Sequence, residues 1–123
     1  MVKRNGMVRY RVIKWRAIGR HLKTSGVFVI WRGGECLFVG KGLRIGGAAR
    51  RALGRHEPHQ FREEVKVELI TGLSKANEGR IVRVCKLEYK PKYNKKPAPF
   101  PTAYTRKRGQ ELLRELQEHR DNN

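Results

Sequence analysis

The sequence predicts an α/β domain in which a small three-stranded antiparallel sheet is flanked by helices. Two short apolar runs, at residues 27–31 and 36–39, are separated by a Gly-Gly pair, a pattern typical of a β-hairpin. A third run, residues 64–70, alternates apolar and charged side chains as a half-buried strand does. Apolar residues at helical spacing lie between and after these strands, which indicates helices packed on a sheet.

Three helices are expected. The first covers residues 47–56, with Ala48, Ala49, Ala52 and Leu53 on its buried side. The second covers residues 75–89: Ser74 is its N-cap, Pro91 stops it, and its buried stripe is Ile81, Val84 and Cys85. The third covers residues 103–119 and carries a narrow stripe of Leu112, Leu113 and Leu116 for docking on the core or on a partner chain.

The chain divides into a basic extension at residues 1–24, a core at residues 25–97, and a linker with a helix at residues 98–123. Within the extension, Val8, Tyr10 and Val12 alternate with arginines, which is a weak strand signal. Two possibilities stay open for the extension: it packs on the core, or it becomes ordered on nucleic acid.

Charge is the dominant feature of the composition. Among 123 residues, 29 are Lys or Arg and 11 are Asp or Glu, giving a net charge of +18. The first 56 residues contain fourteen Lys and Arg and a single acid, Glu35. A field of this strength attracts polyanions and displaces their counterions, which favours nucleic acid as the partner.

Membrane and disulfide classes are not favoured. No apolar run approaches 18 residues, so no membrane-spanning helix is expected. Cys36 and Cys85 are far apart and form no CxxC pair, which argues against a zinc site or a disulfide framework. We therefore expect an intracellular location, cytoplasmic or associated with nucleic acid.

Several motifs occur in a recognisable order. The hairpin opens with Gly26-Val27-Phe28 and closes with Phe38-Val39-Gly40-Lys41, an arginine-rich helix follows, and Lys90-Pro91-Lys92-Tyr93-Asn94 comes last. Over residues 26–94 the chain resembles the GIY-YIG nuclease family, in particular the nuclease domain of the bacterial excision-repair enzymes. The resemblance implies a three-stranded antiparallel sheet with surrounding helices. It also implies phosphodiester hydrolysis with one divalent cation.

In that family a first-strand tyrosine helps to activate water and a second-strand tyrosine shapes the site. A helical arginine stabilises the transition-state charge, and a helical glutamate holds the cation. The corresponding positions here are Phe28, Phe38, Lys41, Arg51 (with Arg50 next best), Val82 and Asn94. Neither phenylalanine has a hydroxyl and valine cannot ligate a hard cation, so the resemblance implies degenerate catalytic residues.

One alternative keeps catalysis. Glu78 lies one helical turn before Val82 and is the candidate metal ligand for Mg²⁺ or Mn²⁺, with His56 or His59 in place of the missing base. If the site is degenerate, no cofactor is expected.

The sequence thus supports three hypotheses and leaves open whether the chain is an enzyme. The first is a degenerate GIY-YIG domain that grips the phosphate backbone of DNA or RNA through a basic cleft. The second is an active, metal-dependent endonuclease. The third is a structural protein of a nucleic-acid assembly, such as a ribosome-associated or packaging protein, whose basic ends become ordered in the complex. The candidate nucleic-acid-binding residues are Lys41, Arg44, Arg50, Arg51, Arg55 and His56. The C-terminal helix could also bind a protein partner or a second copy of the chain.

Overall fold

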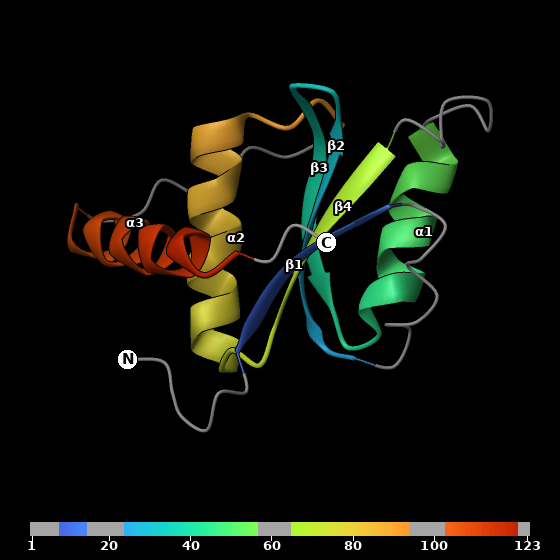
Figure 1. Cartoon of the computed structure of the whole chain (residues 1–123). Coiled ribbons are helices and arrows are strands. Elements are labelled where there is room, and N and C mark those ends of the chain that lie inside the picture. Colours follow the sequence, from blue (N-terminus) through green and yellow to red (C-terminus); the bar gives the residue numbers. More distant parts are fainter. Residues whose placement is uncertain (1–7, 15–23, 57–64, 94–102, 121–123) are drawn as a thin grey trace.

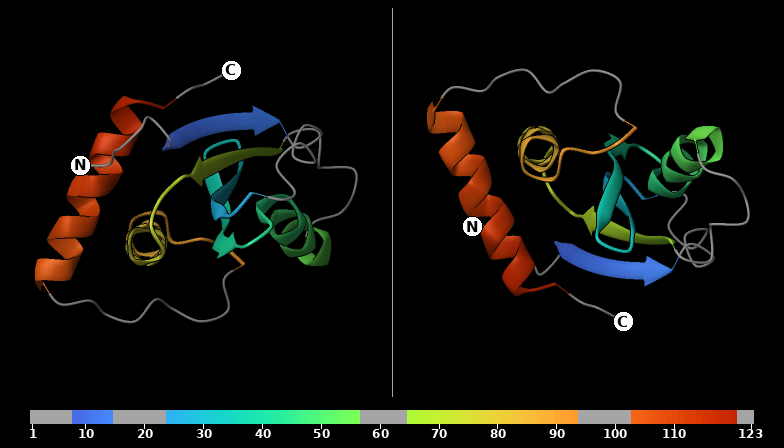
Figure 2. Two further views of the ribbon diagram at one scale, coloured as in Figure 1. Left: turned by 90° about the horizontal axis from the view of Figure 1, so that it is seen from below. Right: turned by 90° about the horizontal axis from the view of Figure 1, so that it is seen from above.

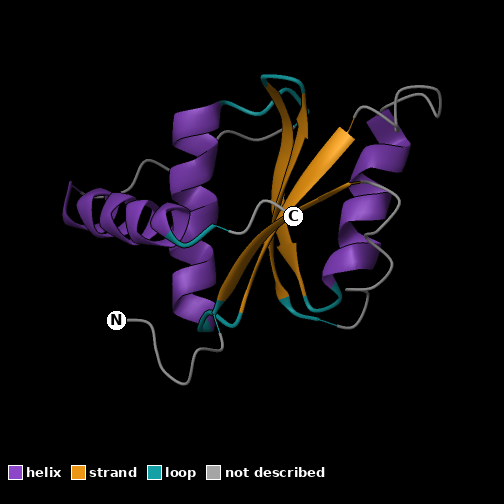
Figure 3. Ribbon diagram, in the orientation of Figure 1, coloured by secondary structure: helices purple, strands orange, loops and turns teal. Residues whose placement is uncertain are grey.

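The structure is a computed structural model that describes residues 8–14, 24–56, 65–93 and 103–120. The described parts form an α/β fold of four strands and three helices (Figure 1; Figure 3 distinguishes helices from strands). In chain order these are β1 (Arg9–Lys14), β2 (Gly26–Arg32), β3 (Glu35–Gly42), α1 (Ile45–His56), β4 (Val65–Thr71), α2 (Lys75–Tyr89) and α3 (Ala103–Glu118).

The sheet is antiparallel throughout and its strand order is β1-β4-β2-β3. The prediction of three strands was therefore wrong by one. The fourth strand is β1, which lies within the basic extension and pairs along its whole length with β4, Tyr10 facing Ile70. Pairing brings Tyr10 and Ile13 into the core, where they are 3% and 9% exposed. Burial of these two side chains explains why the extension folds onto the sheet here.

The hairpin predicted from the Gly-Gly pair is confirmed as β2 and β3. Gly33 has a φ of 62°, a left-handed conformation that residues with a side chain rarely adopt. Phe28 pairs with Gly40 and Ile30 with Phe38, so both phenylalanines lie on the same face of the sheet.

Helices cover both faces of the sheet. One face packs against α1, and the other packs against α2, with α3 lying outside α2 (Figure 2). The core on the α1 face is formed by Ile13, Phe28, Ile30, Leu37, Ile45, Ala49, Val65, Val67 and Leu69. The core on the α2 face is formed by Tyr10, Val27, Val29, Cys36, Val39, Ile70, Ile81, Val84, Cys85, Leu113 and Leu116.

The helix limits follow from local chemistry. The α2 helix has the predicted bounds: the Asn77 N–H donates to the Ser74 hydroxyl at 3.2 Å, and Lys90 ends the helix in a left-handed conformation. The α1 helix starts two residues before its predicted limit. The reason is that Ile45 is fully buried and its N–H donates to the Thr24 carbonyl at 2.7 Å.

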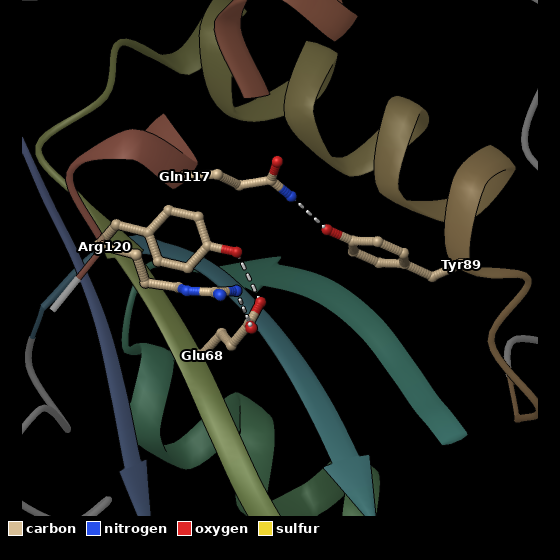
Figure 4. A network of polar contacts seen from close by, with 5 residues as sticks. Glu68, Tyr89, Gln117 and Arg120 are labelled. Atoms are coloured by element: carbon tan, nitrogen blue, oxygen red, sulfur yellow. Dashed lines mark hydrogen bonds and ion pairs between the residues drawn. The ribbon is translucent and has the colours of Figure 1, made fainter. Parts of the chain in front are cut away.

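The α3 helix ends at Glu118 and is fastened to the rest of the fold. Leu113 and Leu116 are buried against α2, as the leucine stripe predicted. Gln117 donates to the Tyr89 hydroxyl at 3.0 Å, and Arg120, just beyond the helix, pairs with Glu68 at 3.1 Å (Figure 4). The third helix is thus docked on the core of its own chain.

Candidate nucleic-acid interface

The candidate interface begins at one end of the sheet. The start of β2 at Gly26 pairs with the end of β3 at Gly42 and with the end of β4 at Thr71. The α1 and α2 helices both begin shortly after those strand ends, at Ile45 and Lys75. The N-termini of two helices and the Lys41 region therefore meet at the same end of the sheet.

Thr24 and Ser25, which directly precede β2, each form a hydrogen bond to one of these helices. The Thr24 carbonyl accepts the first N–H of α1, from Ile45, and the Ser25 hydroxyl donates to the Glu78 carboxylate at 3.2 Å. Glu78 lies in the first turn of α2 and is only 4% exposed. Its negative charge at a helix N-terminus is favourable, and Ser25 satisfies part of its hydrogen-bonding capacity.

Four predicted phosphate ligands are exposed: Arg50 and Arg51 on α1, Arg44 just before it, and Lys41 near the end of β3. Lys41 pairs with Val27, which belongs to the core on the α2 face, so the Lys41 side chain leaves the sheet on that face. We call Arg44, Arg50 and Arg51 the α1 surface. Residues 36–56 contain no acid, so no carboxylate of this segment competes for these cations. Arg55 and His56 belong to α1, but their side chains lie outside the described residues.

Phe28 and Phe38, which the GIY-YIG resemblance places at the family's tyrosine positions, form a packed pair. Their rings are stacked with centroids 5.8 Å apart and an interplanar angle of 6°. A Cβ at Gly40 would lie 2.7 Å from Phe28 Cζ and 3.0 Å from Phe38 Cε1, so glycine is required beneath the stack. Phe28 is 2% exposed and Phe38 is half-buried. This arrangement packs aromatic surface and offers no hydroxyl to a water molecule.

The remaining family positions are not all brought together. Phe28 and Phe38 belong to the α1 face, whereas Val82 is partly buried and packs against the core on the α2 face, so the sheet separates them. Lys92 and Tyr93 do return to the hairpin: their N–H groups donate to the Cys36 and Leu37 carbonyls at 3.1 Å and 2.9 Å. Asn94 and His59 lie outside the described residues.

Within the described residues, Glu78 does not belong to a larger cluster of potential metal ligands. Across the described residues, no three His, Cys, Asp or Glu side chains are grouped so that they could hold a metal ion. The structure gives Glu78 a different partner, Ser25, which the sequence analysis did not single out. The only sequence signal for Ser25 is a polar pair directly before a buried strand, and such pairs are common at strand starts.

The chain matches no protein-family model, no curated protein and no solved structure. None of the described helices is long and apolar enough to cross a membrane.

Proposed function

We propose that this chain binds nucleic acid through the phosphate backbone, and that the α1 surface makes the contacts. The observation that carries the proposal is the exposure of Arg44, Arg50 and Arg51 along a stretch without any acid. Exposed cations gain from contact with phosphate, because each contact releases condensed counterions.

We further propose that the domain is a GIY-YIG fold kept for binding after its catalytic residues were lost. Support comes from the hairpin, α1, β4 and α2, which follow one another in the family order. The return of Lys92 and Tyr93 to β3 also supports it, because it brings the last motif beside the hairpin. Phe28 and Phe38 retain ring packing without hydroxyls, and Val82 retains apolar packing without a carboxylate. A protein that binds nucleic acid without cleaving it needs the packing of these side chains and does not need the hydroxyls or the carboxylate.

The state of the two cysteines supports an intracellular location for this protein. Cys36 and Cys85 are both buried free thiols, in accord with an intracellular, reducing compartment.

The assembly hypothesis expected both basic ends to become ordered only in a complex. The described parts of these ends, β1 and α3, are already folded onto the core, which favours a binding domain that acts as a folded unit.

The test combines binding and cleavage on the full chain. Gel shifts with a DNA duplex and with a structured RNA are measured over a series of salt concentrations. They use the wild type, a triple variant of the α1 surface (Arg44→Gln, Arg50→Gln, Arg51→Gln) and a control triple variant (Lys14→Gln, Lys66→Gln, Arg83→Gln). The control removes the same charge from exposed positions outside α1. Supercoiled plasmid is incubated in parallel with Mg²⁺ or Mn²⁺ or with EDTA, using the wild type and Glu78→Ala.

We expect wild-type binding that weakens steeply with salt, and no nicking. Three lost phosphate contacts should lower the slope of log K against log salt by roughly 2.7 for duplex DNA. Salt-independent binding, or equal weakening by both triple variants, would refute the α1 surface as the binding site. Metal-dependent nicking that disappears in Glu78→Ala would instead establish the active-nuclease alternative.

A further inference from the structure

A second group of exposed cations lies on α3. Arg106, Lys107 and Arg108 are exposed in the first half of this helix, and we call them the α3 surface. They belong to a second stretch without acids, residues 89–110. That stretch contains seven cations: Lys90, Lys92, Lys95, Lys96, Arg106, Lys107 and Arg108.

The charges of α3 run against its helix dipole. Its first turn contains no acid and includes Arg106, while its last turn contains no base and includes Glu115 and Glu118. Cations near a helix N-terminus and anions near a C-terminus are each unfavourable, because the helix dipole repels them. The α2 helix shows the ordinary arrangement, with Glu78 in its first turn and Lys86 in its last. An anionic partner bound at the start of α3 would offset the unfavourable interaction between the cations there and the helix dipole.

The α3 surface is separated from the α1 surface by the body of the fold. The sheet and α2 lie between α1 and α3 in every view (Figures 1 and 2). The α3 helix ends beside the sheet, where Arg120 reaches Glu68, and it begins farther out (Figure 2). A stiff duplex lying on α1 therefore cannot also lie on the start of α3.

We propose that the α3 surface is a second phosphate-binding surface, so that one chain holds two nucleic-acid duplex segments on opposite sides. The proposal rests on the proposed function of the α1 surface. Charge complementarity supports it: the three cations are exposed, they lie in an acid-free stretch, and the buried stripe of α3 is already used against α2. Arg108 is paired with Glu111 at 3.7 Å, an exposed contact that a phosphate can replace at little cost.

The experiment measures the stoichiometry of the complex and the bridging of two duplexes, with blunt DNA duplexes of about 12 base pairs as the probe. These duplexes are far shorter than the persistence length of about 150 base pairs, so one duplex cannot wrap around the protein. Analytical ultracentrifugation gives the numbers of chains and duplexes in each complex. In a capture assay, an immobilised duplex binds the protein, and a fluorescent second duplex reports bridging. The variants are the α1 triple, the control triple and an α3 triple (Arg106→Gln, Lys107→Gln, Arg108→Gln).

We expect one chain with two duplexes for the wild type and for the control triple. The α1 and α3 triples should each retain one duplex, and each should lower capture of the second duplex by about tenfold or more. The proposal is overturned if the wild type saturates with one duplex, or if its complex contains two chains. It is also overturned if the α3 triple still binds two duplexes or the α1 triple binds none. Failure of the wild type to bind any duplex would instead refute the proposed function itself.

Discussion

The phenolic hydroxyl of Tyr10 donates a 2.6 Å hydrogen bond to the carboxylate of Glu68, joining two adjacent strands that lie 58 residues apart in the chain. Glu68 is 6% exposed and also accepts from Arg120, which follows α3. A buried carboxylate is costly unless it is hydrogen-bonded, and here it has two donors from opposite ends of the chain. Glu68 thus links the first strand, the central sheet and the C-terminal helix.

Removing the Tyr10 hydroxyl should destabilise the fold. Tyr10→Phe leaves the ring in place and deletes one hydrogen bond to a charged group, for which we expect a loss of about 1.5–3 kcal/mol in the free energy of unfolding. Urea denaturation measures this change. Arg120→Gln and the double variant complete a mutant cycle, in which a coupling energy near zero would contradict a shared carboxylate.

Alkaline pH should weaken the protein. Burial raises the pKa of the Cys36 thiol from 9.0 to about 12, and burial together with the Glu68 charge raises the pKa of Tyr10. The unfolded chain ionises these groups first, so stability is complete below about pH 9 and falls as the pH rises toward 12. Each group lowers the free energy of unfolding by about 1.4 kcal/mol per pH unit within its own interval. Urea midpoints between neutral pH and about pH 11 test this, and Cys36→Ala should flatten the decline.

The contact between α2 and α3 is tight at one glycine. A Cβ at Gly109 would overlap the Val84 side chain. Gly109→Ala should therefore cost about 1–3 kcal/mol, as overpacking does in other cores. Gly79→Ala is the matched control, because a Cβ there meets no atom within 4 Å. We expect that control to gain about 0.5–1 kcal/mol from reduced backbone entropy in the unfolded chain. Equal stabilities in urea would show that α3 is not held closely against α2.

Much of the fold could be predicted because its signals are local. The Gly-Gly turn, Ser74 at the start of α2 and Pro91 after its end each act within a few residues. The membership of β1 in the sheet could not be predicted, because it depends on pairing with a strand more than 50 residues away. The alternation of polar and apolar residues in β1 is short, and equally short alternations occur in segments that pair with no other strand.

Some features of the candidate site could likewise be predicted from the sequence, and others could not. The exposure of Lys41, Arg44, Arg50 and Arg51 follows from charge, since isolated charged side chains stay in water. The contact of Ser25 with Glu78 spans 53 residues and has no sequence signature. The separation of Val82 from the phenylalanine pair likewise depends on which face of the sheet each helix covers, and the strand order decides that.

Placing a tyrosine at Phe28 in β2 should cost stability without producing cleavage. Phe28 is 2% exposed, and its Cζ, the atom that would carry the new hydroxyl, lies over Gly40. Phe28→Tyr buries that hydroxyl, so we expect a loss of about 1–3 kcal/mol in urea denaturation. In Phe38→Tyr, the control, the ring is half-buried and the hydroxyl can reach water, so a change within about 0.5 kcal/mol is expected.

Neither variant should nick supercoiled plasmid in Mg²⁺ or Mn²⁺. A hydroxyl supplies only one part of the chemistry, and the position that the proposed GIY-YIG resemblance assigns to the metal-binding glutamate holds Val82, on the other face of the sheet. If Phe28→Tyr alone produced metal-dependent nicking that Glu78→Ala then removed, the missing hydroxyl at this position would be the only barrier to catalysis. In that case Glu78, despite its contact with Ser25, would be a metal ligand in a site that needs one hydroxyl to work.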